Sequence, residues 1–149
     1  VPWPVGIGGE GNDGVAAVVQ QQAGSIGYVE LSYATESGLA MATLENQAGN
    51  LITPSLESTS AAAVGVEFPE DLRFSVSNSA GEQAYPIVGA TWILVYEKMK
   101  DAAKVDALKA WLTWSLNEGT AIAEELGYAP LSEELKALAL AKIESVSSF

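Results

Sequence analysis

The sequence predicts a mixed α/β fold, and three observations lead to this prediction. A segment rich in Ile, Val, Thr and Trp runs from Tyr85 to Tyr96 and is typical of a strand. From Asp101 on, helix-forming residues predominate and apolar residues recur at helical spacing. Near the N-terminus, a glycine-rich turn leads into a helical pattern that stops at Gly24, and a short β-like segment follows. Segments of these kinds together indicate a mixed sheet with flanking helices.

Composition restricts the classes of function. The chain has 149 residues, 48% apolar and 17% charged, which fits one domain-sized globular unit. It has no Cys and no His, so disulfides and a Ser–His or Cys–His catalytic pair are impossible within it. We expect no enzyme, no metal site and no cofactor. No apolar run approaches the roughly 18 residues of a membrane span, and no signal-peptide pattern begins at Val1.

Charge is distributed unevenly along the chain. The net charge of −12 argues against nucleic acid and against anionic membrane surfaces as partners. Residues 1–72 contain no Lys or Arg, and the first cation is Arg73. The acids of that stretch are Glu10, Asp13, Glu30, Glu36, Glu45, Glu57, Glu67, Glu70 and Asp71. An anion bound there would have to be held by backbone dipoles rather than by salt bridges.

Periodicity and capping residues predict the individual elements. Helices are expected at 12–22, 54–64, 101–126 and 132–145, with one helical turn at 31–36. Strands are expected at 25–30, 40–44, 50–52 and 73–76, with the principal strand at 86–96. The expected N-caps are Asn12 or Asp13, Thr53 followed by Pro54, and Ser132.

Apolar residues at helical spacing indicate the packed faces. The positions expected to be buried are Val15, Val18, Val19, Val105, Leu108, Leu112, Leu135, Leu138 and Ile143. Trp92, Trp111 and Trp114 lie in apolar stretches, and no basic groove accompanies them. We therefore expect these indoles to pack in the core rather than to stack on a ligand.

The glycine turn imitates a dinucleotide fingerprint. Residues 6–11 read G-x-G-x-x-G, and Glu30 lies near the position where an acid would contact a ribose. The context disfavours that site, because prolines interrupt the preceding segment and Glu10 occupies the place of a pyrophosphate. The turn is better explained by a backbone geometry that needs glycine.

Five separated segments carry a resemblance to a known family. They are Trp3–Ala17, Gly24–Glu30, Pro54–Ser58, Ala84–Tyr96 and Leu126–Leu131. In order and spacing they resemble landmarks in the C-terminal half of the phosphate-binding protein of bacterial phosphate ABC transporters, a periplasmic-binding-protein family. The resemblance covers essentially the whole chain.

The resemblance implies a two-lobed, hinged, type II-like fold with phosphate in the cleft. Residues 1–85 would then be the remainder of the second lobe, 86–96 a strand that crosses the hinge, and 97–149 terminal helices that pack on the first lobe. The family's direct phosphate ligands would all lie upstream of Val1. Near-site candidates in this chain are Gly8, Gly9, Asn12 and Asp13.

The implied function is that of the substrate-binding component of a phosphate ABC transporter. This chain would need the N-terminal half of the fold, or a companion chain, to bind inorganic phosphate. The transporter's membrane subunits would be further partners. The location would be periplasmic or extracellular, and a membrane anchor in a preceding N-terminal segment would be compatible with it. An alternative is a self-assembling structural protein that retains half of the fold and binds no phosphate. In either case we expect that the chain alone exposes apolar faces and is not a compact monomer, with Leu135, Leu138 and Ile143 as candidates for such a face. Self-association without phosphate would favour the structural protein.

Overall fold

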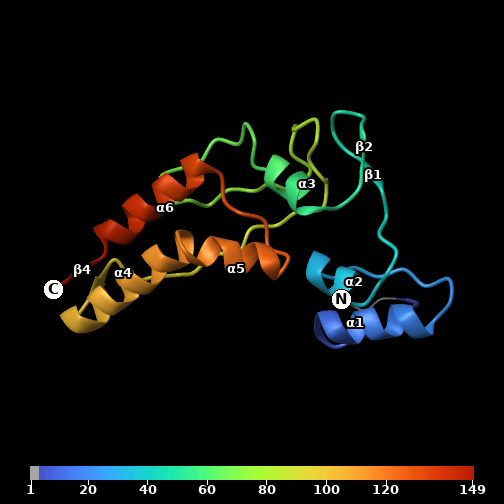
Figure 1. Cartoon of the computed structure of the whole chain (residues 1–149), viewed down its shortest axis with the longest axis horizontal. Coiled ribbons are helices and arrows are strands. Elements are labelled where there is room, and N and C mark those ends of the chain that lie inside the picture. Colours follow the sequence, from blue (N-terminus) through green and yellow to red (C-terminus); the bar gives the residue numbers. More distant parts are fainter. Residues whose placement is uncertain (1–3) are drawn as a thin grey trace. The chain divides into compact units, whose positions relative to one another are not determined.

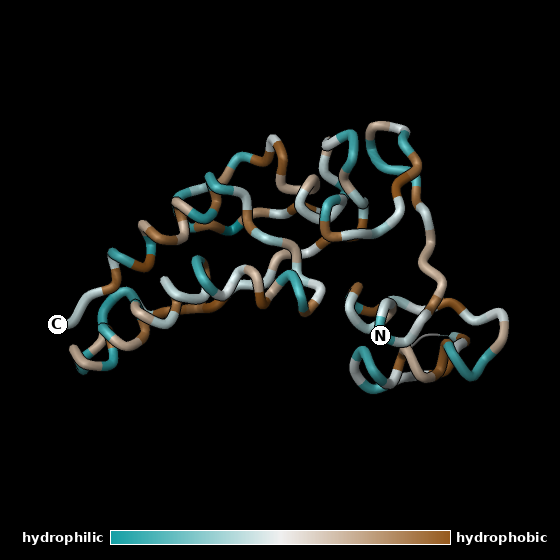
Figure 2. Tube along the Cα trace, viewed as in Figure 1, coloured by the Kyte–Doolittle hydropathy of each residue, from teal (hydrophilic) through white to brown (hydrophobic). Residues whose placement is uncertain are grey.

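The computed structural model describes residues 4–149 and divides into two compact units, 1–42 and 43–149 (Figure 1). Most of the regular structure is helical, and the strands are two residues long (Figure 1). Apolar residues are spread over both the helices and the irregular segments between them (Figure 2). Among the described residues, no helix is long and apolar enough to cross a bilayer.

The first unit contains two helices, α1 (Gly11–Gln21) and α2 (Leu31–Glu36), which confirms both predictions. The predicted cap of α1 is wrong. Glu10 is the N-cap residue and makes no side-chain cap, so the helix begins before Asn12 and Asp13. An acidic residue at this end is still favourable because the helix dipole is positive there.

Residues 25–30 form no strand, so that prediction is wrong. They lie instead against the apolar side of α1, where Ala16 is buried. A methyl group on Gly27 would come within 2.9 Å of both Val15 Cγ1 and Val19 Cγ2. A strand needs a neighbour for its backbone hydrogen bonds, and the described part of this unit offers no second extended segment that pairs with it.

The second unit begins with a small hairpin. Strands β1 (Leu44–Glu45) and β2 (Leu51–Ile52) pair antiparallel, with Leu44 opposite Ile52. Gly49 has φ +83° in the connecting turn, a conformation that glycine adopts without steric cost. The predicted hairpin is confirmed, although its first strand begins at Leu44 rather than at residue 40.

Helix α3 (Leu56–Ala61) begins two residues later than the expected Thr53–Pro54 start and ends before Val64. Its N-cap is Ser55, which accepts a hydrogen bond from the Ser58 backbone N–H at 3.1 Å. The Ser58 hydroxyl also bonds the Ser55 backbone N–H at 2.9 Å, completing a capping box. This reciprocal pair outcompetes Thr53, whose own side chain bonds Thr43 Oγ1 at 2.8 Å.

The predicted strands at 73–76 and 86–96 are both wrong, since neither segment is a strand. The two segments nevertheless run antiparallel to each other. Asn78 N–H donates to Pro86 O at 2.8 Å, and the Trp92 indole N–H donates to Leu72 O at 2.8 Å. We call this pair of segments the open hairpin, residues 72–92. Its backbone contacts are too few to form a ladder.

A small core lies at the base of the open hairpin. Ala62, Val76 and Ala84 are buried together, and half-buried Phe74 and Val88 pack against them. The Phe74 ring also meets the Trp92 ring edge-on, with centroids 5.6 Å apart. Side chains, rather than a ladder of backbone hydrogen bonds, therefore hold the open hairpin together.

The C-terminal part contains α4 (Ala102–Leu116), α5 (Gly119–Glu125) and α6 (Glu133–Ser145). The single helix predicted for 101–126 is wrong, because Asn117 leaves helical geometry at φ −106°, ψ −86°. The expected stop at Gly127 is confirmed. Gly127 has φ +83°, its N–H bonds Glu124 O at 3.0 Å, and the following N–H bonds Ala123 O at 2.9 Å.

Helices α4 and α6 pack together, and short strands β3 (Lys98–Met99) and β4 (Ser147–Ser148) pair in parallel beside them. The expected cap of α6 is confirmed, since Ser132 Oγ accepts from the Leu135 N–H at 3.2 Å. The side chains buried in these two helices are Val105, Leu112, Leu135 and Ile143.

Leu138 is 37% exposed, so its assignment to the core is wrong, and Leu135 and Ile143 form no exposed face. Trp92, Trp111 and Trp114 are also exposed rather than in the core. Each helix is apolar on more than one side, whereas a packed pair covers only one side of each.

Asn46 joins the hairpin to the open hairpin. Its side chain is only 5% exposed, and Nδ2 donates to three carbonyl oxygens of residues 81–84 at 3.0–3.2 Å. Its Oδ1 accepts from the backbone N–H groups of Ala48 and Asn50 at 3.1 and 3.0 Å. One buried amide thus satisfies backbone groups from two segments more than 30 residues apart.

Replacing Asn46 with Ala should destabilise the second unit by about 1–3 kcal/mol, because buried backbone groups lose their partner. Thermal unfolding followed by circular dichroism measures the change. Asn117→Ala is the matched control, since the exposed Asn117 amide bonds only Thr113 O, at 2.8 Å. Equal destabilisation by the two variants would contradict the role assigned to Asn46.

Candidate functional site

The glycine turn before α1 is built around one close approach. A Cβ on Gly9 would lie 2.6 Å from Val15 N and 2.7 Å from Gly14 C. A Cβ on Gly14 would in turn lie 3.2 Å from Gly9 C. The two glycines let the turn lie directly on the first turn of α1. At Gly8, by contrast, no atom lies within 4 Å of such a Cβ.

The polar residues of the same turn are engaged within the unit. Asn12 Oδ1 accepts a hydrogen bond at 3.0 Å from the backbone N–H of Glu30, the N-cap residue of α2. Asp13 is exposed in the first turn of α1, and Glu10 precedes it as N-cap residue. Two carboxylates therefore lie at the positive end of this helix, and their negative charge would repel an anion that bound there.

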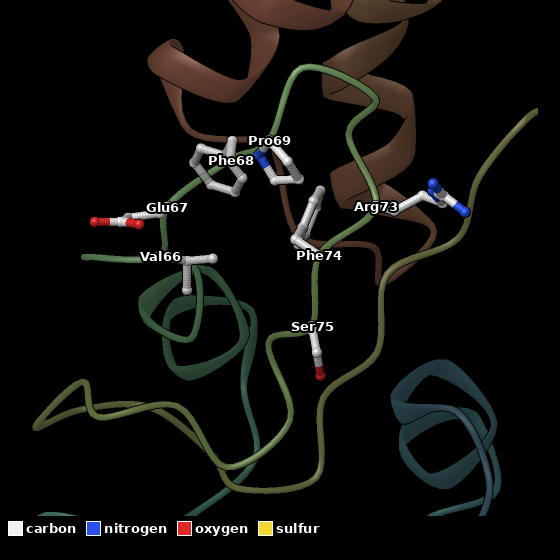
Figure 3. A pocket seen from close by; sticks show the side chains of 7 residues that line it. All are labelled: Val66, Glu67, Phe68, Pro69, Arg73, Phe74 and Ser75. Carbon is white, nitrogen blue, oxygen red and sulfur yellow. The ribbon is translucent and has the colours of Figure 1, made fainter.

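A pocket of about 440 Å³ lies in the second unit and was not predicted from the sequence. Phe68 and Phe74 form its centre, with their rings edge-on and 4.9 Å apart. Figure 3 shows the charged groups of Glu67 and Arg73 directed away from this centre. The space they leave is lined mainly by apolar side chains, so it lacks the charged donors of an anion site.

Arg73, the first cation of the chain, is paired locally. Its Nη2 lies 2.6 Å from Asp71 Oδ2, and its side chain is 86% exposed. Hydrogen bonds from the Arg73 backbone N–H, at 3.1 Å, and from its guanidinium hold the pKa of Asp71 below the ordinary value. The Arg73 guanidinium is therefore paired with a carboxylate of its own loop.

A second cavity, of about 330 Å³, opens beside β2 and the start of α3. Its polar groups come from Thr53, Ser55, Glu57, Ser58 and Gln83. The Ser55 side chain lowers the pKa of the fully exposed Glu57 by hydrogen bonding. Since Ser55 and Ser58 also cap α3, their hydroxyls already have partners within the chain. Among the described residues, no group of three or more Asp or Glu side chains could hold a metal ion.

Comparison with known proteins decides the family. Residues 1–118 match the family model described as PBP superfamily domain. This chain belongs to the PBP superfamily. Its family is one of binding proteins rather than enzymes.

Curated PBP relatives cover almost the whole of this chain. The phosphate-binding protein PstS of Xylella fastidiosa (strain 9a5c) is 43% identical over 137 residues, which are 91% of this chain and 38% of the relative. PstS of Pasteurella multocida is 39% identical, with 91% of this chain and 40% of the relative covered. PstS of Methanocaldococcus jannaschii is 36% identical over 166 residues, with 98% and 42% covered. The chain therefore spans about two fifths of the length of these relatives.

In this PBP chain, Gly8, Gly9, Asn12 and Asp13 lie together at the glycine turn and the start of α1. The close packing of Gly9 on α1 and the hydrogen bond of Asn12 to Glu30 account for these two residues without a ligand. Their role near a ligand stays a prediction. The sequence predicted a turn whose backbone geometry needs glycine, and the close approach of Gly9 to Gly14 agrees with that prediction.

The packing role of Gly9 gives a direct test. Gly9→Ala should destabilise the first unit by about 1–3 kcal/mol, because the added methyl group meets the α1 backbone. Gly8→Ala, at an open position, is the control and should leave stability nearly unchanged. Amide hydrogen exchange in α1 reports the difference. If both variants leave α1 equally protected, the close approach does not constrain the turn.

Proposed function

We propose that this chain is part of the substrate-binding component of a phosphate ABC transporter and that it binds phosphate only together with the rest of the fold. The observation that carries the proposal is the similarity to phosphate-binding proteins along 91–98% of the chain. The chain spans only 38–42% of those relatives, which leaves most of each relative outside the matched region. The direct phosphate ligands then belong to that remaining part.

The chemistry of the glycine turn supports this division. Glu10 and Asp13 stand at the N-terminus of α1, and no cation occurs in residues 1–72 to offset them. A helix N-terminus contributes about 0.3–1 kcal/mol to binding an exposed anion. A micromolar dissociation constant corresponds to about 8 kcal/mol. The turn therefore supplies only a small part of the binding free energy that a micromolar phosphate site needs.

In the second unit, the two pockets described above contain no cation other than Arg73. Arg73 is paired with Asp71, and its guanidinium is directed away from the aromatic pocket (Figure 3). The remaining cations all lie at or beyond Lys98. The proposed partner is thus the N-terminal half of the same fold, or a companion chain, which supplies the ligand groups. The proposed location is periplasmic or extracellular, with the membrane subunits of the transporter as further partners.

Residues 86–96 have a role in the same proposal. We assign 1–85 to the second lobe, 86–96 to the hinge crossing and 97–149 to helices that pack on the first lobe. An extended apolar segment with few backbone hydrogen bonds fits a strand whose neighbours come from the rest of the fold. A self-assembling structural protein is the second candidate function, and the same exposed apolar side chains favour it.

Calorimetry with inorganic phosphate tests the proposed function. The 149-residue chain alone should show binding no tighter than the millimolar range, which corresponds to about 4 kcal/mol. Adding the N-terminal half of a relative, as a separate chain or a fusion, should restore micromolar binding. Sulfate is the control anion, and it should bind more weakly because a carboxylate in the cleft can accept a hydrogen bond only from protonated phosphate.

Tight phosphate binding by residues 1–149 alone would contradict the proposed division and point to the turn at Gly8–Asp13. Failure of the complemented form to bind phosphate would instead favour the self-assembling structural protein.

A further inference from the structure

Leu72 has a strained backbone, with a φ of +55° in the left-handed region. Leucine rarely adopts this conformation, because its Cβ then approaches a backbone carbonyl oxygen too closely. The other non-glycine residue with positive φ in the described chain is Asn78, and asparagine tolerates that region better. A strained residue of this kind persists only where surrounding contacts hold it in place.

Three hydrogen bonds hold the chain at Leu72. Its N–H donates to Pro69 O at 2.9 Å, and the N–H of Arg73 donates to Asp71 Oδ1 at 3.1 Å. Both of these bonds stay within one short loop. The third bond comes from 20 residues further along the chain, where the Trp92 indole N–H donates to Leu72 O at 2.8 Å. Trp92 therefore connects the strained position to a distant part of the chain.

Trp92 makes a second contact with the same loop. Its ring meets the Phe74 ring edge-on, with centroids 5.6 Å apart, and Phe74 in turn meets Phe68 at 4.9 Å. Phe68 and Phe74 form the centre of the aromatic pocket (Figure 3). A row of three rings thus joins the pocket to Trp92. We call residues 68–74 the pocket loop.

Trp92 lies in residues 86–96, whose earlier part is tied to the opposite arm of the open hairpin. Asn78 N–H donates to Pro86 O at 2.8 Å, and the Ser77 hydroxyl donates to Val88 O at 2.9 Å. Trp92 follows these two contacts along the chain. Its indole therefore reaches the pocket loop only while residues 86–96 keep their path.

We propose that Trp92 couples the conformation of residues 86–96 to that of the pocket loop. When residues 86–96 are held in one path, the indole hydrogen bond and the ring contact stabilise the strained Leu72. When these residues become more mobile, placing the indole costs more conformational entropy, and the pocket loop opens more often. Trp92 is thus a positioning residue for the aromatic pocket.

Trypsin gives a specific probe of the pocket loop, because Arg73 is the only Lys or Arg in residues 1–97. Cleavage after Arg73 releases a fragment that mass spectrometry identifies. Its rate follows the fraction of molecules with an open loop, provided that opening and closing are fast compared with cleavage. Dividing each rate by that of the matching synthetic 68–80 peptide corrects for the sequence preference of the protease.

Trp92→Phe keeps a ring beside Phe74 and removes the indole donor. Cleavage after Arg73 should become roughly threefold to tenfold faster, the effect of one lost hydrogen bond. Trp111→Phe on α4 is the matched control, because Trp111 is 52% exposed and Trp92 is 45% exposed. The control should leave the rate unchanged. Equal rates for the two variants would overturn the proposal.

Leu72→Gly distinguishes local strain from a general loss of stability. Glycine adopts positive φ without steric cost, so in the Trp92→Phe background this change should slow cleavage again. In a chain that is merely less stable, the same change would speed cleavage, because glycine adds conformational freedom to the unfolded state. Faster cleavage of the double variant than of Trp92→Phe would contradict the role assigned to Leu72.

Thr91→Gly tests the coupling itself. Thr91 is exposed, and glycine at this position makes the backbone beside Trp92 more flexible. Cleavage after Arg73 should become roughly twofold to fivefold faster in the otherwise wild-type chain. In the Trp92→Phe background the same change should have little effect, since the connection is already lost. Equal effects in the two backgrounds would overturn the coupling.

The N-terminal half of the fold provides a further test, which rests on the proposed function because that proposal gives residues 86–96 their neighbours there. Adding this half should slow cleavage after Arg73 roughly threefold or more, and Trp92→Phe should remove most of the effect. Phosphate binding by the complemented form without slower cleavage would overturn the coupling and leave the proposed function intact. Absence of phosphate binding would contradict the proposed function, while the variants of the isolated chain would still decide the coupling.

Discussion

The structure of this chain depends on how each segment satisfies its backbone hydrogen bonds. A helix does so within itself, whereas an extended segment needs a neighbour. Helices α1, α4 and α6 meet this need alone and are 11–15 residues long. The extended segments find few partners in the described chain, and its strands are two residues long. The unpaired groups are therefore concentrated between the helices.

The same constraint explains what the sequence could predict. Caps and helical spacing are local, so Ser132 before α6 and Gly127 after α5 were identified correctly. The strand at 86–96 was wrong because β-propensity describes a residue's fit to a sheet, not the presence of one. The cap of α3 was wrong for a local reason, since Ser55 and Ser58 form a reciprocal pair that a search for Thr-Pro starts overlooks.

Burial was harder to predict than helix position. The spacing that marked Leu135 and Ile143 for the core was correct, yet the same spacing failed for Leu138. The three exposed tryptophans show the same difficulty, because apolar composition identifies side chains that favour burial without naming what covers them. In the candidate site, sequence reasoning found the glycine turn. It missed the aromatic pocket because the contact between the Phe68 and Phe74 rings depends on the path of the loop between them, which the sequence pattern does not reveal.

Under the proposed function, this chain carries only part of a divided binding site. It should then lack partners for some of its backbone groups as well as affinity for phosphate. Amide hydrogen exchange of the 149-residue chain, at a dilution where it is monomeric, measures this directly. We expect rapid exchange throughout residues 91–96 while the cores of α4 and α6 remain protected, with slow exchange at 91–96 once the N-terminal half is added. Slow exchange at 91–96 in the dilute chain alone would contradict the account, because those groups would then already have partners.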